Sequence, residues 1–388
     1  MRIPFLIVGG GIGGLATALA LSRTGRSVHL IEKDDEFGEI GAGLQLAPNA
    51  SRMLDRLGVL DEISKSAVYP KRLAWMDAIS GKLLTAANLG EPFQQRYGYR
   101  YIVMHRGDLL NVLLEACRAS GRISLESGKR AIAVEDSGDS ARVCCADGVV
   151  YDCDAVIAAD GLWSTVRKFV HDDGDPVCSM YVAYRGTIPA SRFSQGTPPE
   201  EMVLWTGPEK HFVRYPLRGK KLYNQVAVFR SYRYQEGSDD WGTPDELDEH
   251  FAQTCTEVRD GIALMDRSRR WPILDRPPIA NWTQNRITLL GDAAHPMQQY
   301  LAQGACQALE DAVTLANCVE RNGDHIDWAF LAYQEIRSPH TARVQLAARA
   351  FGEFWHRMPE RLEERNRLLL QRSHDNYTEL DWVYGPRE

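Results

Sequence analysis

A glycine-rich turn near the start of the chain constrains its fold most strongly. The mostly apolar residues 1–8 lead directly into Gly9-Gly10-Gly11-Ile12-Gly13-Gly14. Apolar residues then recur at helical spacing through residues 15–20, Gly25 follows, and residues 28–31 form a second apolar run. This order predicts a buried parallel strand, a tight turn, a helix and a second parallel strand.

The spacing of the glycines, with an acidic residue after the second strand, indicates a dinucleotide site. Gly9, Gly11 and Gly14 allow a tight turn, close approach of the backbone to a pyrophosphate, and close packing of the helix on the strand. The N–H groups at the start of the helix would face the phosphates, and Glu32 would accept hydrogen bonds from a ribose diol. In this context we expect a dinucleotide site and not an ordinary glycine turn.

Length and composition limit the other possibilities. The 388 residues are enough for two lobes, and a net charge of -7 argues against a nucleic-acid surface. No stretch approaches the about 18 apolar residues of a membrane span, and a strand that begins at residue 3 leaves no room for a leader peptide. The eight cysteines lack metal-ligand spacing. We therefore expect a cytoplasmic protein with reduced thiols, no bound metal and no membrane span.

Two later segments favour FAD over NAD. Residues 154–161 and 286–292 each read as an apolar strand that ends in an Asp-Gly or Gly-Asp pair, so that Asp160 and Asp292 lie at strand ends beside small residues. Such positions suit the hydroxyls of the ribityl chain, which NAD lacks. A helix that begins at Gly304 would direct its positive end at the negative charge of a reduced flavin. Either pair alone could be a turn; the three motifs in order favour FAD.

With these motifs the chain resembles the flavin-dependent aromatic hydroxylases that have one dinucleotide-binding domain, the group that includes p-hydroxybenzoate and salicylate hydroxylases. Three further segments resemble the 3-hydroxybenzoate 6-hydroxylases in particular. They are residues 37–45 (FGEIGAGLQ), His211 with residues 215–219 (YPLRG), and residues 299–305 (QYLAQGA). Salicylate hydroxylases usually carry a different segment in place of Gln299-Tyr300.

The resemblance implies an α/β fold in which a Rossmann-like FAD-binding domain is interleaved with a mostly antiparallel-sheet substrate domain, followed by C-terminal helices. The expected segments are 1–70, 97–175 and 277–320 for the FAD-binding domain, 71–96 and 176–276 for the substrate domain, and 321–388 for the C-terminal helical region. In that last region, apolar spacing predicts a helix from Ser338 to Arg372, interrupted at Pro359. The general frequency of symmetric oligomers favours a homodimer.

The implied reaction uses FAD, NADH or NADPH, and O2 to hydroxylate a small phenolic acid. A phenolate pushes electron density to its ortho and para carbons, so a group that removes the phenol proton is the central contribution of the protein. His211 is the first candidate for that base, and Gln299 could orient the phenol oxygen. Tyr215, four residues after His211 and on the same side of a strand, could bind the carboxylate. Asp77 is a weaker pocket candidate, for which a turn role is an equal alternative.

The same resemblance assigns the cofactor contacts. The residues expected to hold FAD are Gly9, Gly11, Gly14, Glu32, Arg106, Asp160 and Asp292. Pro296, Gly304 and Ala305 should line the isoalloxazine ring, whereas the ring of His295 is expected to be structural. Since no second glycine motif follows a strand, NAD(P)H must bind without a domain of its own. NADH as the preferred donor is implied by the resemblance alone.

The expected product is 2,5-dihydroxybenzoate, formed from 3-hydroxybenzoate by attack para to its hydroxyl. Salicylate, other hydroxybenzoates and hydroxypyridine acids stay open as substrates. A flavin-dependent halogenase would carry a Trp-x-Trp-x-Ile segment, which Trp271-Pro272-Ile273 does not reproduce. A non-hydroxylating flavoprotein reductase and, from another class, a dinucleotide-sensing protein without turnover are the remaining alternatives.

Overall fold

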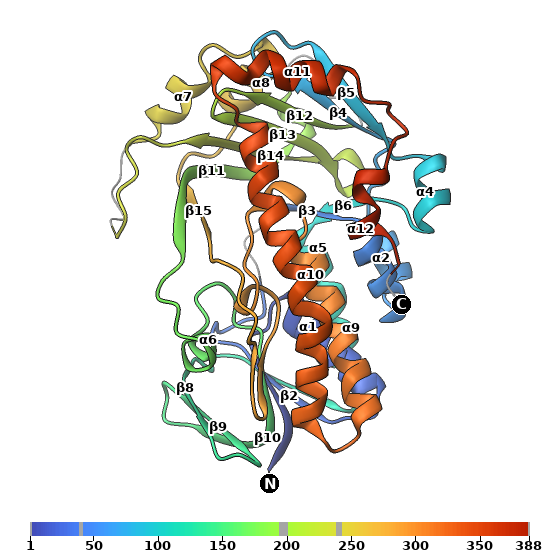
Figure 1. Ribbon diagram of the computed structural model, residues 1–388, viewed down its shortest axis with the longest axis vertical. Helices are drawn as coiled ribbons and strands as arrows, with labels where there is room; N and C mark the ends of the chain where they lie inside the picture. The colour runs from blue at the N-terminus through green and yellow to red at the C-terminus, as the bar shows by residue number, and fades with distance from the viewer. Residues whose placement is uncertain (1, 39–41, 194–200, 238–242, 387–388) are drawn as a thin grey trace.

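The computed structural model describes residues 2–38, 42–193, 201–237 and 243–386. A mostly parallel sheet with its helices forms one end of the molecule, and a mostly antiparallel sheet forms the other (Figure 1). Glu39, Ile40 and Gly41, which belong to the segment 37–45 of the resemblance, lie outside the described residues.

The first sheet contains the predicted strands on both sides of the glycine turn. Its path is β16-β17-β10-β1-β2-β7, and the pairs from β17 to β7 are parallel. The strands of this path are β1 (Ile3–Val8), β2 (Val28–Ile31), β7 (Ile123–Glu126), β10 (Val150–Ala158), β16 (Thr283–Gln284) and β17 (Ile287–Leu289). Two antiparallel strands, β8 (Ala131–Asp136) and β9 (Ala141–Cys145), extend from β10. The strand–turn–helix–strand prediction is confirmed.

Helices cover this sheet and bury its apolar strands in the largest core of the molecule. The helix after the glycine turn, α1 (Ile12–Arg23), contacts both α5 (Arg106–Arg118) and α9 (Gly304–Asn322). Shorter elements complete this end: α2 (Pro48–Arg56), α3 (Leu60–Ser64), α6 (Thr165–Val170) and the two-stranded sheet of β3 (Gly43–Leu46) with β6 (Ile102–His105).

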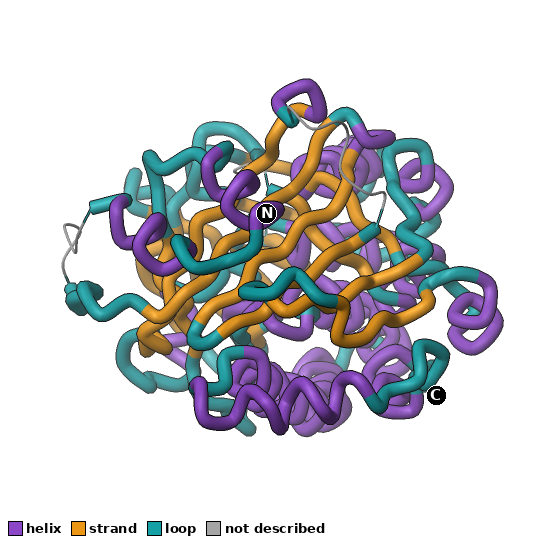
Figure 2. The backbone as a smooth tube through the Cα atoms, turned by 90° about the horizontal axis from the view of Figure 1, so that it is seen from above, coloured by secondary structure: helices purple, strands orange, loops and turns teal. Residues whose placement is uncertain are grey.

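The second sheet, named the substrate sheet here, has the order β15-β11-β14-β13-β12-β4-β5, and only β12 with β4 is parallel among its pairs of described strands. Its strands are β4 (Arg72–Asp77), β5 (Leu83–Asn88), β11 (Val177–Pro189), β12 (Met202–Gly207), β13 (Lys210–Leu217), β14 (Leu222–Arg230) and β15 (Trp271–Asp275). Seen from above, the strands occupy the centre of the molecule and helices lie around them (Figure 2). The predicted mixed α/β fold with a mostly antiparallel second sheet is confirmed.

The substrate sheet has two different faces because side chains alternate along each strand. Phe212 of β13 packs in a core with α7 (Asp245–Phe251) and α8 (Thr256–Ala263), which defines the outer face. His211 and Tyr215 therefore project from the opposite, inner face. Small peripheral elements are α4 (Glu91–Tyr97), η1 (Ala190–Arg192) and η2 (Arg218–Lys220).

One long helix, α10 (Ile326–Trp355), runs from the parallel sheet to the inner face of the substrate sheet (Figure 1). The prediction that this helix begins at Ser338 was wrong, because its first turns are held by packing of buried residues such as Phe330 and Tyr333. Pro339 lies inside the helix without ending it. The chain then forms η5 (Pro359–Arg361), α11 (Leu362–Leu370), η6 (Thr378–Leu380) and α12 (Asp381–Tyr384).

No helix among the described residues is long and apolar enough to cross a membrane.

Candidate functional site

Two positions of the glycine turn require glycine, Gly9 for its backbone conformation and Gly14 for lack of space. Gly9 has a φ of 108°, a region that side chains disfavour, and its N–H donates to the carbonyl of Ile31 at 2.8 Å. A Cβ atom on Gly14 would overlap the carbonyl of Gly9, so α1 can approach β1 only with glycine there. The turn therefore ends with the unpaired N–H groups of α1 beside an open groove.

That groove has a volume of about 710 Å³ and lies at the carboxyl ends of the parallel strands. The sequence-predicted residues that line it are Gly9, Gly11, Glu32, Arg106, Asp160, Asp292, Gly304 and Ala305. Gly14 and Pro296 are not in the lining: Gly14 packs against Gly9, and the carbonyl of buried Pro296 accepts a bond from Gln345 Nε2 at 2.8 Å. The tertiary structure thus brings six separated segments, around residues 9–11, 32, 106, 160, 292 and 304–305, to one groove.

Two carboxylates of the groove each accept a hydrogen bond from a backbone N–H within the protein. Glu32 Oε2 accepts from the N–H of Gly10 at 2.6 Å, and Asp160 Oδ2 accepts from the N–H of Thr165 at 2.9 Å. Among the described residues, the buried Oδ1 of Asp160 has no partner. Burial raises the pKa of Asp160, against several hydrogen bonds that lower it. A buried acceptor that faces a groove fits a polyol hydroxyl, so the residues present fit the ribityl chain of FAD.

The Gly-Asp segment is fixed by a buried ionic cluster. Asp311 of α9 accepts from the N–H of Gly291 at 3.1 Å, contacts His295 Nε2 at 2.5 Å and pairs with Arg337 Nε of α10 at 2.6 Å. Arg337 also bonds Glu310 at 2.5 Å. Burial by itself would raise the pKa of Asp311, but His295 and Arg337 together lower it to about 2. We name these residues the α9–α10 ionic cluster; it anchors η3 (Gly291–Ala293) and gives His295 a structural role.

His211 lies on the inner face of the substrate sheet, surrounded by aromatic rings. Its ring centroid lies 5.0 Å from that of Trp355 and 5.8 Å from that of Tyr300, and its Nδ1 lies 2.7 Å from Nε2 of His356. The residue is 2% exposed, and this burial lowers the pKa of His211 to about 3. Burial therefore keeps the imidazole neutral at physiological pH.

Gln299 begins the short helix η4 (Gln299–Leu301), which follows the Gly-Asp segment. Its side chain is exposed, whereas the next residue, Tyr300, is buried and is the one that contacts His211. The structure thus joins the segment of Gln299 to His211 through Tyr300. In the described part of the chain, the two predicted catalytic side chains, His211 and Gln299, make no direct hydrogen bond or ring contact with each other.

Tyr215 is buried on the same face of β13 as His211. Burial raises the pKa of Tyr215, and a hydrogen bond with the side chain of Gln45 lowers it by a smaller amount. Gln45 Oε1 also accepts from the hydroxyl of Tyr101 at 2.7 Å. Tyr215 is thus tied to β3, which carries part of the 37–45 segment.

Asp77 closes a turn at the end of β4. Its Oδ1 accepts from the N–H of Ser80 at 2.7 Å and of Ile79 at 3.2 Å, and its Oδ2 lies 3.9 Å from the buried guanidinium of Arg365. These contacts supply the turn role that the sequence left open as the alternative to a pocket role.

Two residues near the inner face were missed by sequence reasoning. Asn224, opposite Tyr215 on β14, accepts from the N–H of Gly43 at 2.7 Å, and its buried Nδ2 has no partner among the described residues. An Asn-Gln pair inside an apolar strand was a usable signal, because buried amides need partners. The other missed residue, His356, follows the end of α10 and had no local signal, since only tertiary contact brings it to His211.

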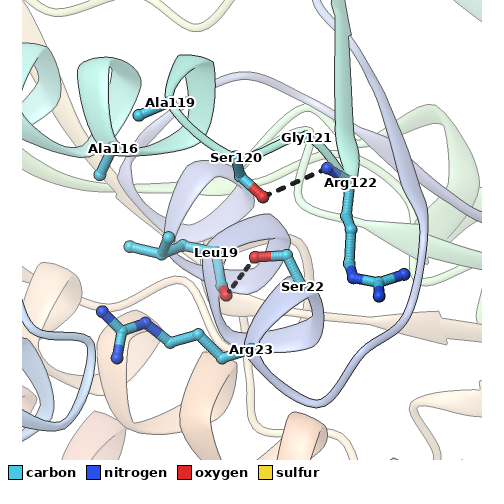
Figure 3. A pocket seen from close by; sticks show the side chains of 8 residues that line it. All are labelled: Leu19, Ser22, Arg23, Ala116, Ala119, Ser120, Gly121 and Arg122. Atoms are coloured by element: carbon cyan, nitrogen blue, oxygen red, sulfur yellow. Dashed lines mark hydrogen bonds between the residues drawn. The ribbon is translucent and has the colours of Figure 1, made fainter.

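A second concavity lies at the opposite end of α1 from the glycine turn (Figure 3). It is lined by Leu19, Ser22, Arg23, Ala116, Ala119, Ser120, Gly121 and Arg122. Its serine hydroxyls bond to the local backbone: Ser22 donates to the carbonyl of Leu19 at 2.9 Å, and Ser120 accepts from the N–H of Arg122 at 3.4 Å. This surface is therefore separate from the groove. In the described ranges, no group of three or more His, Cys, Asp or Glu side chains is arranged for a metal ion.

Comparison with known proteins agrees with this geometry. The FAD binding domain family matches residues 2–348. The 3-hydroxybenzoate 6-hydroxylases of Polaromonas naphthalenivorans (strain CJ2) and Klebsiella oxytoca are 39% and 37% identical over 384 residues, and each match covers 99% of this chain and 96% of the relative. The structure of Klebsiella pneumoniae HpxO complexed with FAD and uric acid superposes with a TM-score of 0.85 at 26% identity, covering 99% of this chain and 97% of that one.

The groove, the two sheets and these matches define a flavoprotein, and the chain belongs to the FAD binding domain family. Within that family it is a flavin-dependent aromatic monooxygenase similar to 3-hydroxybenzoate 6-hydroxylases, as the resemblance implied.

Proposed function

We propose that this enzyme hydroxylates 3-hydroxybenzoate para to its hydroxyl, giving 2,5-dihydroxybenzoate, with NADH as electron donor and O2 as oxidant. The observation that carries the proposal is the position of His211. It is a neutral, buried imidazole on the inner face of the substrate sheet, in contact with Tyr300 of the 299–305 segment. The near full-length similarity to three 3-hydroxybenzoate 6-hydroxylases, at 37–39% identity, supports the choice of substrate.

The side chains divide the work on the substrate between them. Nε2 of His211 accepts the phenol proton, which leaves the ring oxygen with the electron pair that activates the para carbon. The Gln299 amide bonds the phenol oxygen and fixes its orientation, and the Tyr215 hydroxyl binds the carboxylate. Aromatic side chains around His211 exclude water, which strengthens each of these polar contacts.

The cofactor contacts follow from the groove. FAD supplies the redox chemistry when bound. The N–H groups of α1 would hold its pyrophosphate and Glu32 and Asp160 would accept from its hydroxyls, while Arg106 and Asp292 also line the groove. The N-terminus of α9 at Gly304, which lines the groove, would favour negative charge on a flavin bound there. We also propose the interleaved division of the chain at the limits given above; the pairing of β4 with β12, which adds β4 and β5 to the sheet of residues 177–275, supports it.

The test is NADH oxidation by the FAD-loaded enzyme in air, with and without 3-hydroxybenzoate, with the aromatic product identified by chromatography. We expect stimulated oxidation with one 2,5-dihydroxybenzoate formed per NADH, and slower turnover with NADPH. Stimulation that yields only peroxide would show an effector that is not the substrate. No stimulation would contradict the proposal, and the next compounds would be salicylate, aminohydroxybenzoates and hydroxynicotinates, which suit the chemistry of more distant relatives.

A further inference from the structure

His211 and His356 form a hydrogen-bonded pair of buried imidazoles. The two ring planes differ by 17°, the centroids are 4.9 Å apart, and Nδ1 of His211 lies 2.7 Å from Nε2 of His356. This combination places the two nitrogens near the line that joins the centroids, so the rings meet edge to edge and one N–H points at a lone pair. The contact is therefore a directed hydrogen bond and not a stack of ring faces.

Elements far apart in sequence hold this pair in place. Tyr181 of β11 stacks on the ring of His356 at a centroid distance of 4.4 Å, with 16° between the planes. Tyr300 meets both imidazoles edge-on, at 5.8 Å from His211 and 5.2 Å from His356. His356 itself is 5% exposed and lies directly after the last residue of α10. The pair thus has little freedom to rotate.

The surroundings of the pair disfavour a second proton. No described carboxylate contacts either imidazole, and the buried guanidinium of Arg365 donates to the carbonyl of Trp355 at 2.7 Å, one residue before His356. Burial first, and then His211 and Arg365, lower the pKa of His356 well below its usual value. Two neutral imidazoles share one hydrogen between the facing nitrogens, so the tautomer of one fixes the tautomer of the other.

Only one arrangement leaves His211 able to accept a proton from a phenol. If Nδ1 of His211 carries the hydrogen and donates it to His356, then Nε2 of His211 keeps a free lone pair. If His356 donates instead, Nε2 of His211 carries a hydrogen and can only donate. The structure gives Nε2 of His211 no hydrogen-bond partner in the described ranges, so it stays available for substrate.

We propose that His356 is a positioning residue: it accepts the Nδ1 hydrogen of His211 and thereby holds the tautomer whose Nε2 removes the phenol proton. This inference rests on the proposed function of His211 and deepens it. In the step, the phenol O–H bond breaks, an N–H bond forms at Nε2 of His211, and the resulting positive charge is shared across the hydrogen bond with His356. The C-terminal helical region then has a role in catalysis, since α10 carries His356 to the site.

Two substitutions test whether His356 acts as a hydrogen-bond acceptor or only fills space with its ring. His356→Phe keeps a ring but has no acceptor, whereas His356→Gln keeps an oxygen that can accept from Nδ1. With FAD bound, we expect His356→Phe to form about tenfold less 2,5-dihydroxybenzoate per NADH, the loss typical of one buried hydrogen bond, and His356→Gln to restore most of it. The apparent pKa of the bound phenol, followed by its ultraviolet spectrum, should rise in His356→Phe and return in His356→Gln.

The matched control is His250→Gln. His250 stacks on Phe229 at 4.5 Å on the outer face of the same sheet and does not touch His211. We expect this variant to keep its yield of hydroxylated product. Unchanged yield and phenol pKa in His356→Phe would overturn the proposal, as would equal losses in the phenylalanine and glutamine variants, which would mean that only the shape of the ring matters.

A measurement on the unmodified enzyme covers the case in which His356→Phe does not fold. In ¹⁵N-histidine-labelled protein without substrate, the nitrogen shifts of His211 report its tautomer directly. Hydrogen on Nδ1 is the expected result, and hydrogen on Nε2 would overturn the proposal. This reading does not depend on turnover, so it separates a failure of the positioning role from a failure of 3-hydroxybenzoate as substrate.

Discussion

Two buried histidines near the proposed flavin site, His295 and His211, have different surroundings: one is ionic and the other is aromatic. His295 lies in the α9–α10 ionic cluster, where Asp311 holds its Nε2 and Arg337 balances the carboxylates. His211 lies among aromatic rings, and its hydrogen-bond partner is the neutral imidazole of His356. Asp311 fixes the ring of His295 in place, whereas burial among aromatic rings favours the neutral form of His211. The first environment therefore anchors a loop, and the second keeps the imidazole of His211 neutral.

The largest expected difference between the two histidines is in turnover. We expect His211→Ala to retain FAD and to lose hydroxylation by about 10²–10⁴-fold, the usual contribution of a general base, with reducing equivalents lost to peroxide. Gln299→Ala should uncouple in the same way to a smaller extent. The checks are the flavin absorption spectrum, the product yield per NADH and peroxide formation. Full coupling in both variants would contradict the assignment. The comparison variant is His295→Gln, which we expect to bind FAD more weakly but to keep its product yield per NADH.

The ionic cluster should give the largest effect on stability. Arg337→Leu leaves Glu310 and Asp311 buried without their cation, which we expect to cost about 3–5 kcal/mol of unfolding free energy. Urea unfolding followed by circular dichroism measures this loss. Arg118→Leu is the control, because its pair with Glu115 is exposed and contributes at most about 1 kcal/mol. Equal stability of the two variants would mean that the cluster does not anchor α9 to α10.

The glycine turn should be more sensitive to an added methyl group than a surface turn. In Gly14→Ala the Cβ overlaps the backbone carbonyl of Gly9, which cannot move away as a side chain would. We expect a cost of about 1–3 kcal/mol, with weaker FAD binding because the turn opens. Gly121→Ala, where a Cβ meets open space, should be neutral. FAD titration and thermal unfolding of both variants test this pair, and normal FAD affinity in Gly14→Ala would contradict the close-packing role.

The smallest predicted effect is the pH dependence that His211 adds to stability. Unfolded histidine binds a proton below a pKa of about 6.5, whereas burial keeps native His211 neutral down to about 3, so acid favours the unfolded chain. The stability that depends on a neutral His211 is full above pH 6.5 and is lost as the pH falls from 6.5 towards 3. Between pH 7.5 and 5.5 we expect the wild type to lose about 1 kcal/mol more than His211→Gln in urea unfolding. Parallel losses would show that His211 is protonated in the native enzyme.

The predictability of the two regions follows from how their residues are spaced along the chain. Much of the groove is built from contiguous motifs that follow the ends of strands of one parallel sheet, so Glu32, Asp160 and Asp292 could be named in advance. The inner face combines strands, a one-turn helix and the end of α10. Alternation predicted that His211 and Tyr215 share a side of β13, but not what lies opposite them. The start of α10 was misplaced because burial of Phe330 and Tyr333 extends the helix beyond its strongest apolar repeat.

The sequence by itself determined the dinucleotide class of cofactor and favoured FAD, and strand alternation put His211 and Tyr215 on one side of a strand. The two-sheet architecture and His211 as the proposed base were implied by the resemblance to the aromatic hydroxylases. Glycine spacing, strand-end aspartates and strand alternation are local properties, and local backbone sterics enforce them. Only the tertiary structure decided that His211 is neutral and that His356 is its partner. Burial and hydrogen-bond direction depend on which distant segments pack together, and residues 211 and 356 meet only when α10 docks on the substrate sheet.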